Sequence, residues 1–466
     1  MDTANQDNRL WTRCGTFFCN AWPARWRRAE AGVLVFGALV FSIIYLCQLN
    51  LIATYAVNVP YWDEWENLRE GNLSSELSWS WLIARHNEHR IVLTKLLTWV
   101  LFRCNGWDLV VQQIVNYMIF GVLLVSLIFW AWTACERRVP LGLWFLLGLF
   151  LLAPTNHENH LWGFQSQIHF ALLFLVIAVF FLFHTSACWC RIFVGTTAAV
   201  LGMYSFSSGA ISALIVVLVF AVVKLSVFFR CGRSRQDLLH TFFVVSVVGL
   251  AFALWLVGYE TPAHHPDLTW PHQRLFWDFL SNSVSLGFGF DNVSGGYGIA
   301  ILVFLAVPLV VLLGRNRWLP DCRGGAILAF SGAILASLAS IALGRAGGFP
   351  LHLSKASRYF EISSPLIVVI AVAWCLVLRK RPKPLYTLMA VYFMSVGTAF
   401  VNNWDFRIVY EAESRFRQQT VQCIEAYYSG RGDANCHRSY ANPINEQLDR
   451  AQRLNLSFYR DIERSE

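Results

Sequence analysis

The chain has 466 residues, of which 56% are hydrophobic and only 14% are charged. A soluble domain carries about 25% charged residues, so this composition excludes an ordinary soluble protein. The net charge of +8 at pH 7 is concentrated in alternate loops, and that placement indicates membrane topology rather than binding to nucleic acid.

Long apolar runs follow one another along most of the chain. Many reach the length of about 20 residues that an α-helix needs to cross the hydrocarbon core of a bilayer. Their continuous apolar character differs from the alternating pattern of a membrane β-barrel strand. We therefore predict an all-α, polytopic helical membrane protein with about eleven transmembrane helices. The expected spans are 32–54, 110–134, 140–155, 167–187, 192–205, 210–229, 239–258, 297–314, 324–343, 361–378 and 385–402.

Basic residues decide the orientation, because loops rich in Lys and Arg stay in the cytoplasm. Residues 1–31 and every second loop after the first span are basic, which places the amino terminus in the cytoplasm. An odd number of spans then places residues 403–466 on the opposite face, as a small α-helical outer domain. We expect a multi-pass protein of the cell (inner) membrane, with its transmembrane bundle over 32–402. The basic positions are Arg9, Arg13, Arg25, Arg27, Arg28, Arg137, Arg138, Arg191, Arg230, Arg233, Arg235, Arg315, Arg317, Arg323, Arg379, Lys380, Arg381 and Lys383.

The first outer loop, residues 55–109, opens with two adjacent carboxylates, Asp63 and Glu64, between Trp62 and Trp65. A carboxylate near a low-dielectric boundary has a raised pKa, which suits a general base. A solvated loop with ordinary acidic residues is the alternative. The position just beyond a span favours the general base.

The same loop ends in a run of hydrogen-bonding side chains at the membrane boundary. The residues of this run are His86, Asn87, Glu88, His89 and Arg90, and Lys95 follows. The apolar segment 91–102 is too short to span, and we expect a helix there that lies along the interface. The run predicts a site for a polar ligand, with Arg90 or Lys95 holding a phosphate. A belt of side chains that positions the interfacial helix is the alternative.

The second outer loop carries His157 and Glu158, followed by His160. Polar side chains at membrane depth are costly unless they face a cavity, so we expect them to contribute to a site. A divalent metal is an alternative, although neither loop shows a diagnostic ligand spacing, and we expect no metal or other cofactor. The ligands of such a metal would be His86, His89, His157, Glu158 and His160.

The loop before the tenth span concentrates positive charge on the outer face, against the topological trend. Arg345, Lys355 and Arg358 lie there, and Tyr359 follows. A phosphate group bound at the outer leaflet would explain this exception. Contact with lipid headgroups is the alternative.

Most of the 12 cysteines lie in spans or cytoplasmic loops and are expected to behave as small apolar residues. Cys423 and Cys436 instead lie near each other in the outer tail. A disulfide between them is favoured in an oxidising compartment, and two free thiols are the alternative.

Together these features resemble the GT-C superfamily of membrane glycosyltransferases, which use polyprenyl-phosphate sugars. Asp63 and Glu64, just past the first span, look like the Asp-Glu pair of protein O-mannosyltransferases. Other short motifs look like features of uncharacterised bacterial members of the superfamily. These are His-Asn-Glu-His-Arg at 86–90, the Ser-rich Gly turn at 205–209, and Gly-Arg at 344–345 followed by Ser-Arg-Tyr at 357–359. The tail matches no accessory domain, which leaves the acceptor open.

The resemblance implies inverting transfer of a sugar from polyprenyl phosphate to an extracytoplasmic glycan, lipid or protein. Asp63 first, and Glu64 next, would take the proton from the acceptor hydroxyl. Other outer residues would bind the substrates, and the cations among them would neutralise the departing phosphate. These binding residues are His86, Glu88, His89, Arg90, Lys95, His157, Glu158, Arg345, Lys355, Arg358 and Tyr359.

Three other functions remain open. A transporter or flippase for a lipid-linked sugar would place charges at the midplane of spans or show repeated broken helices, and the sequence shows few such charges and no evident repeat. A lipid-linked glycan ligase is kept open by the long outer loop 259–296. A non-enzymatic membrane scaffold is the third.

Overall fold

The computed structural model describes residues 24–184, 188–231, 235–260, 266–290, 295–315, 320–402, 406–432, 436 and 443–464. Within these ranges every regular element is a helix, and the only strand-like pairing is one bridge between His86 and His89. The described part of the chain therefore confirms the all-helical class.

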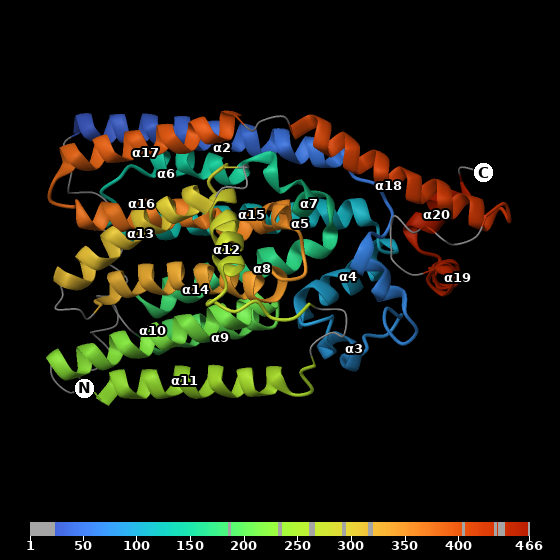
Figure 1. Cartoon of the computed structure of the whole chain (residues 1–466), viewed down its shortest axis with the longest axis horizontal. Coiled ribbons are helices and arrows are strands. Elements are labelled where there is room, and N and C mark those ends of the chain that lie inside the picture. Colours follow the sequence, from blue (N-terminus) through green and yellow to red (C-terminus); the bar gives the residue numbers. More distant parts are fainter. Residues whose placement is uncertain are drawn as a thin grey trace, which may run out of the picture.

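Nine helices within the described ranges are long and apolar enough to cross a membrane, and they run side by side in one bundle (Figure 1). Two shorter apolar helices, α6 (Leu141–Gly148) with its extension η2 (Leu149–Leu152) and α9 (Trp189–Met203), coincide with the remaining expected spans. A multi-pass membrane protein is thus confirmed, while the count of eleven stays a prediction. The long spans are carried by α2 (Ala24–Tyr55), α5 (Leu109–Ala134), α8 (Ser166–Leu182), α10 (Ser207–Cys231), α11 (Arg235–Leu256), α13 (Gly295–Arg315), α14 (Cys322–Arg345), α16 (Pro365–Val377) and α17 (Pro382–Asn402).

The centre of the bundle is α16, because 94% of its spanning segment is buried among other helices. The spanning segments of α2 and α13 are only 17% buried, so these helices lie at the periphery and present apolar side chains outwards. Small residues let neighbouring helices approach closely. Gly37 of α2 lies against Gly142 of α6, and a Cβ atom on either glycine would collide with the opposite backbone.

Three of the expected cytoplasmic loops meet at one end of the bundle. The carboxylate of Glu136 forms ion pairs with Arg138 and Arg323, and an Arg379 nitrogen lies 4.0 Å away. Arg138 also donates a hydrogen bond of 2.8 Å to the carbonyl of Arg379. These three basic loops therefore share an end, as the charge pattern predicts, and the assignment of that end to the cytoplasm stays a prediction.

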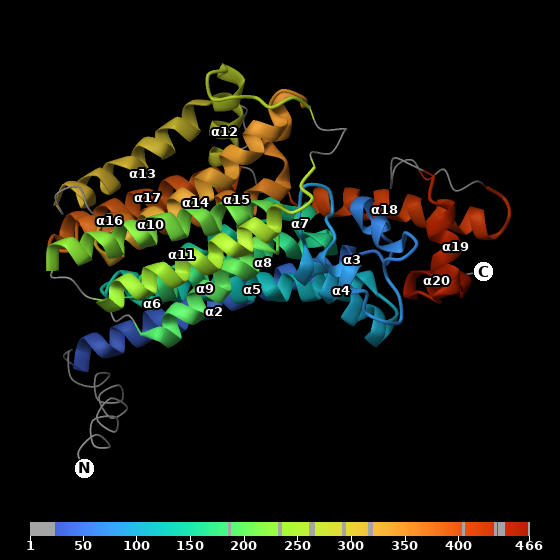
Figure 2. The same cartoon turned by 90° about the horizontal axis from the view of Figure 1, so that it is seen from below.

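At the opposite end, the first outer loop and the tail pack together as one unit, here called the outer module (Figure 2). Its helices and 3-10 turns are η1 (Trp62–Leu68), α3 (Trp79–Ile83), α4 (Val92–Asn105), α18 (Phe406–Tyr428), α19 (Asn445–Arg453) and α20 (Ser457–Glu463). Trp65 and Trp107 from the loop share a hydrophobic core with Leu448 and Phe458 from the tail. This core joins the first loop to the tail, and the expected division of the chain into a bundle over 32–402 and a tail domain over 403–466 stays a prediction.

The disulfide expected in the tail is present, since Cys423 and Cys436 are bonded with an S–S distance of 2.01 Å. Helices also form in the first outer loop, where α4 overlaps the apolar segment 91–102, and their expected place along the membrane interface stays a prediction. The turn expected at 205–209 is shorter, because α10 already begins at Ser207. A Cβ atom on Gly209 would collide with the carbonyl of Gly202, so this glycine allows α9 and α10 to pack closely.

Candidate active site

Four side chains converge between the bundle and the outer module, and we call them the outer site: Asp63, His86, Glu158 and Arg358. They come from η1, from the turn before α4, from α7 (His157–Leu161) and from η6 (Ser357–Tyr359). A short helix, α15 (Phe360–Ser363), links η6 to α16. The central helix of the bundle thus carries Arg358 to the first outer loop.

Asp63 is the accessible carboxylate of the outer site. Its side chain is 33% exposed, and its Oδ2 atom lies 3.7 Å from Nε2 of His86. Burial alone would raise the pKa of Asp63, but the neighbouring side chains of His86 and His89 and the positive charge of Arg358 outweigh it and hold that pKa below its ordinary value. Asp63 is therefore ionised at neutral pH and open to a ligand.

Glu64 differs from its neighbour because its side chain is only 1% exposed. Oε2 accepts a hydrogen bond of 2.9 Å from the backbone N–H of Tyr61, and Oε1 accepts one of 3.0 Å from that of Phe164. Burial raises the pKa of Glu64 to about 7, although Arg417 and the two backbone donors oppose the rise. Glu64 thus ties η1 to η4 (Gly163–Gln165) and is not exposed to a substrate.

His86 and His89 flank a tight turn, in which their backbones exchange hydrogen bonds of 2.8 and 2.9 Å. Nδ1 of His89 lies 2.7 Å from the hydroxyl of Ser207, and burial lowers the pKa of His89 to about 4. The intervening Glu88 accepts a hydrogen bond of 3.1 Å from Arg345. The turn is therefore fixed to α10 on one side and to α14 on the other, which leaves His86 facing Asp63.

Glu158 organises the segment that carries Arg358. Its Oε2 atom accepts a hydrogen bond of 3.1 Å from the backbone N–H of Arg358 and one of 3.2 Å from the hydroxyl of Ser357. The guanidinium of Arg358 lies 5.5 Å from the ring centroid of Tyr359. His157, which precedes Glu158 in the chain, is half-buried beside the ring of Tyr410. Arg358 is therefore an oriented cation close to Asp63.

The other expected cations are bound by groups outside the outer site. Arg90 donates to the carbonyls of Ile83, Trp255 and Val257, and so closes the carboxyl end of α11. Lys95 donates hydrogen bonds of 2.8 and 2.7 Å to the carbonyls of Trp81 and Ala84, and burial lowers its pKa to about 8. The structure thus gives both cations contacts that stabilise helix ends, and their expected role in phosphate binding gains no support.

The tail supplies residues that sequence reasoning did not assign to the site. Arg417 of α18 is 1% exposed, lies 4.3 Å from the ring centroid of Tyr61, and donates to the carbonyl of Leu161. Burial lowers its pKa, but the neighbouring carboxylates Glu413 and Glu64 oppose that change. The only sign of this role in the sequence is the spacing of Glu413 and Arg417, which places an acid and a base one helical turn apart.

A fully buried polar network lies behind the outer site. His169 contacts Glu361 directly, and Asn156 donates a hydrogen bond of 2.7 Å to the same carboxylate. Nε2 of His160 lies 3.7 Å from Glu361, while its Nδ1 lies 2.5 Å from the hydroxyl of Tyr410. The network joins α8 to α7 and α18, which carry Glu158 and Arg417, and to α15, which directly follows the turn that carries Arg358.

The outer site combines an ionised carboxylate with an oriented arginine, an arrangement that can accept a proton and stabilise an anion. The five side chains that the sequence offers as metal ligands do not all meet at one place, because His160 belongs to the buried network and His89 faces Ser207. Within the described ranges, no group of three or more His, Cys, Asp or Glu side chains is placed to hold a metal ion. Comparison with known proteins identifies no relative, since no protein-family model, curated protein or solved structure matches this chain.

Proposed function

We propose that this protein is a membrane glycosyltransferase that moves a sugar from a polyprenyl-phosphate donor to an acceptor hydroxyl at the outer site. The observation that carries the proposal is the ionised, partly exposed carboxylate of Asp63 beside the cation Arg358. Sugar transfer from a phosphate ester needs a base and an anion-stabilising group that can act on one substrate pair at once.

In the proposed reaction, the acceptor hydroxyl donates its proton to Asp63 while its oxygen bonds to the anomeric carbon of the donor sugar. The bond between that carbon and the phosphate oxygen breaks, and its electron pair leaves with polyprenyl phosphate. Attack from the side opposite the phosphate inverts the anomeric centre. Arg358 stabilises the negative charge that develops on the departing phosphate.

Glu64 acts in this proposal as a positioning residue rather than as the second base. Both of its carboxylate oxygens accept backbone N–H groups, and its side chain is buried. Rotating it towards a substrate would leave the N–H groups of Tyr61 and Phe164 without these partners inside the protein, which is unfavourable. Glu64 therefore holds η1 so that Asp63 faces the substrates.

The proposal is tested by incubating purified protein in lipid nanodiscs with a panel of polyprenyl-phosphate sugars and measuring free polyprenyl phosphate. Asp63→Asn is expected to slow release by about 100- to 10,000-fold, the usual contribution of a general base. Glu66→Gln is the matched control, because Glu66 lies in the same 3-10 helix and pairs with Arg69 at 2.7 Å. Unchanged release by Asp63→Asn would refute the assignment of the base, and no release from any donor would refute the function.

A proton-coupled transporter of a lipid-linked sugar is the second candidate, favoured by the buried network of His160, His169 and Glu361. Ionisable groups buried in a bundle are frequent in proton relays. A transporter would move labelled donor across a proteoliposome membrane without consuming it, would require Glu361, and would tolerate Asp63→Asn. Measuring movement and consumption of the donor in the same vesicles separates the two functions.

A further inference from the structure

Two short segments behind the outer site, residues 156–160 and 357–361, are fastened together by side chains, and we call this contact the polar clamp. At one end of the clamp, both backbone polar groups of Arg358 are bound. Its N–H donates a hydrogen bond of 3.1 Å to the carboxylate of Glu158, and its carbonyl accepts one of 3.2 Å from Asn159. The clamp therefore fixes the backbone from which the guanidinium of Arg358 extends.

The other end of the polar clamp is closed by Glu361, which is 1% exposed. Its Oε1 atom accepts a hydrogen bond of 2.7 Å from Asn156 and lies 3.7 Å from Nε2 of His160. Its Oε2 atom contacts Nε2 of His169 in α8. Because Glu361 follows Arg358 by three residues, these contacts hold the turn that carries the arginine.

Hydrogen-bond geometry fixes the number of protons on the pair of His169 and Glu361. The amide nitrogen of Asn116 donates to the carbonyl of Asn159 at 2.9 Å, so the Oδ1 atom of Asn116 is an acceptor. This Oδ1 atom lies 2.6 Å from Nδ1 of His169, which must therefore carry a proton. A second proton lies between Nε2 of His169 and the carboxylate of Glu361, because these groups are in contact. The pair as a whole is therefore neutral.

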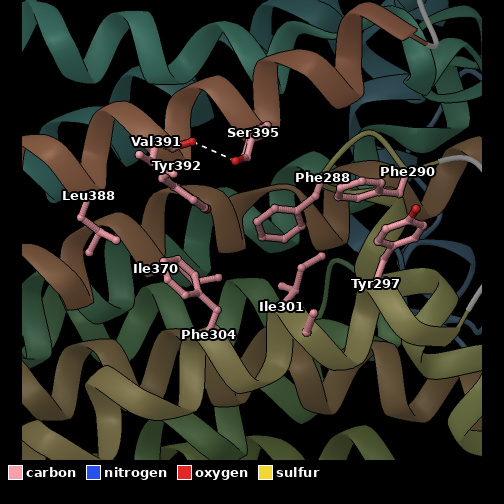
Figure 3. A pocket seen from close by; sticks show the side chains of 12 residues that line it. Phe288, Phe290, Tyr297, Ile301, Phe304, Ile370, Leu388, Val391, Tyr392 and Ser395 are labelled. Carbon is pink, nitrogen blue, oxygen red and sulfur yellow. Dashed lines mark hydrogen bonds between the residues drawn. The ribbon is translucent and has the colours of Figure 1, made fainter.

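A neutral pair suits the apolar surroundings of Glu361. The spanning segment Ser357–Val377, which contains this residue, is 94% buried. A pocket of about 350 Å³ between α13, α16 and α17 is lined mostly by apolar and aromatic side chains, among them Ile370 of α16 (Figure 3). A lone carboxylate in such a region is unfavourable without a partner. Glu361 therefore needs His169 in order to hold the clamp.

Separate contacts hold the chain just before Arg358. Lys355 donates a hydrogen bond of 2.6 Å to the hydroxyl of Ser285 in α12 (Arg274–Leu286), and it also donates to the carbonyl of Phe290. The role in phosphate binding that the sequence predicts for Lys355 stays a prediction. These bonds and the polar clamp hold the chain on both sides of Arg358.

We infer that Glu361 and His169 are positioning residues for the proposed reaction, because their neutral pair holds the clamp that presents Arg358 to the departing phosphate. Both side chains are fully buried, so they act through the backbone of Arg358 and not by touching a substrate. The inference rests on the proposed function for the reaction, whereas the order of the turn needs neither donor nor acceptor.

The first test measures kcat for release of polyprenyl phosphate by purified full-length protein in nanodiscs. His169→Leu is expected to lower kcat by about 10- to 100-fold without raising KM for the acceptor, because a misplacement of about 1 Å can cost this much. His240→Leu is the matched control, since His240 of α11 is equally buried and its ring nitrogens have no hydrogen-bond partner within the described residues. This control should leave kcat unchanged.

Two further variants guard against misfolding. Glu361→Gln keeps the hydrogen bonds, because its amide can accept from Asn156 and donate to His169, so kcat should fall by less than about threefold. The double variant His169→Leu with Glu361→Leu leaves no unpaired charge and should behave as His169→Leu does. A loss by Glu361→Gln as large as that by His169→Leu would overturn the inference and favour a proton relay.

Combination with changes at the outer site separates positioning from general destabilisation. If His169 acts through Arg358, then His169→Leu should lower kcat of an Arg358→Gln protein by no more than about twofold. In a His86→Gln protein, which retains Arg358, the same change should keep its full effect. Equal losses in the two backgrounds would show that His169 does not act through Arg358.

A measurement without substrates tests the clamp itself. Hydrogen exchange of the backbone over residues 354–361 should become about tenfold faster or more in His169→Leu, and should stay unchanged in Glu361→Gln and His240→Leu. Unchanged exchange in His169→Leu would refute the inference whatever the activity. If exchange behaves as expected but the unaltered protein consumes no donor, the proposed transferase function fails and the clamp stands.

Discussion

The two adjacent carboxylates of η1 have opposite environments although they are neighbours in sequence. Asp63 is partly exposed beside His86 and Arg358, and its pKa is lowered, whereas Glu64 is buried among backbone donors, and its pKa is raised to about 7. A single general environment for the loop cannot produce both shifts. The pair therefore separates into a group that can react and a group that holds the backbone, and each role predicts a different dependence on pH.

We predict that the acid limb of the transfer reaction moves to higher pH when His86 is replaced by Gln. A base must be ionised to act, and the lowered pKa of Asp63 keeps it ionised down to its ordinary value of 3.8 or below. His86 lowers the pKa of Asp63, so its removal takes this effect away while burial still raises the pKa of Asp63. Profiles of kcat/KM against pH for the two proteins check this shift.

The control for that measurement is His272→Gln, because His272 is exposed and lies outside the outer site. Its profile should match that of the unaltered protein. Coincident acid limbs for all three proteins would contradict the assignment of Asp63 as the base whose ionisation His86 favours.

Glu64 gives a prediction about stability instead of rate. Its pKa is raised from an ordinary value of 4.5 to about 7 by folding, so its contribution to stability is complete below pH 4.5 and is lost as pH rises through 7. Glu64→Gln removes this titration, and the variant should become more stable relative to the unaltered protein by roughly 2–3 kcal/mol between pH 4 and pH 8. Unfolding in detergent at several pH values measures the difference, and parallel curves would disprove it.

At the scale of elements, α18 connects the tail to the first outer loop through one buried cation. Arg417 lies against Tyr61 and faces Glu64 and Glu413, so its loss would leave buried carboxylates without their counter-charge. Arg415, half a turn away, is exposed and pairs with Glu411 at 3.5 Å within the same helix. The two arginines have the same chemistry and opposite burial, which makes them a matched pair.

We predict that Arg417→Met destabilises the outer module by about 3–5 kcal/mol, because the buried carboxylates that Arg417 faces would lose their counter-charge. Arg415→Met should change stability by at most about 0.5 kcal/mol. Opening of α18 is measured by limited proteolysis, as the rate at which the protease cuts within residues 406–464. Equal cleavage rates for the two variants would show that Arg417 does not hold the tail in place.

The sequence predicts the helices well because the length of an apolar run is a local property. Each expected span coincides with a helix, and α16 and α17 were found this way. The outer module could not be predicted, because its core joins Trp65 to Phe458 across nearly the whole chain. No pattern in either segment indicates the other, so the sequence alone predicts a separate tail domain.

The candidate site could be predicted only in part, for the same reason. Asp63 and Arg358 were both expected at one face, and the structure brings them together. The different roles of Asp63 and Glu64 depend on a backbone N–H of Phe164, one hundred residues away. The sequence predicts Arg90 or Lys95 as a phosphate ligand, because the helix-end carbonyls that Arg90 binds become visible only once α11 is folded against the loop.

The arrangement of the whole molecule depends on two ends with opposite character. Glu136 gathers arginines from three loops at one end, while the outer module covers the other. The helix α9 extends from one end to the other, because the carbonyl of Tyr204 at its carboxyl terminus accepts a hydrogen bond of 2.9 Å from the backbone N–H of Val92 in the outer module. Its amino terminus, with Cys190, must then lie towards the basic end. The positive charge of that end predicts that it faces the cytoplasm.

We predict that Cys104 and Cys190 lie on opposite sides of the membrane, which can be tested with two variants that each keep only one of these free cysteines. Cys104 at the end of α4 and Cys190 at the start of α9 are both exposed, so accessibility from water depends mainly on the side of the membrane. In intact cells, a membrane-impermeant maleimide should label Cys104 and spare Cys190, because the charge pattern predicts that the outer module lies outside. Inverted vesicles should show the reverse pattern. Labelling of both cysteines from the same side would leave α9 without a crossing and would remove the basis for placing the outer site opposite the basic loops.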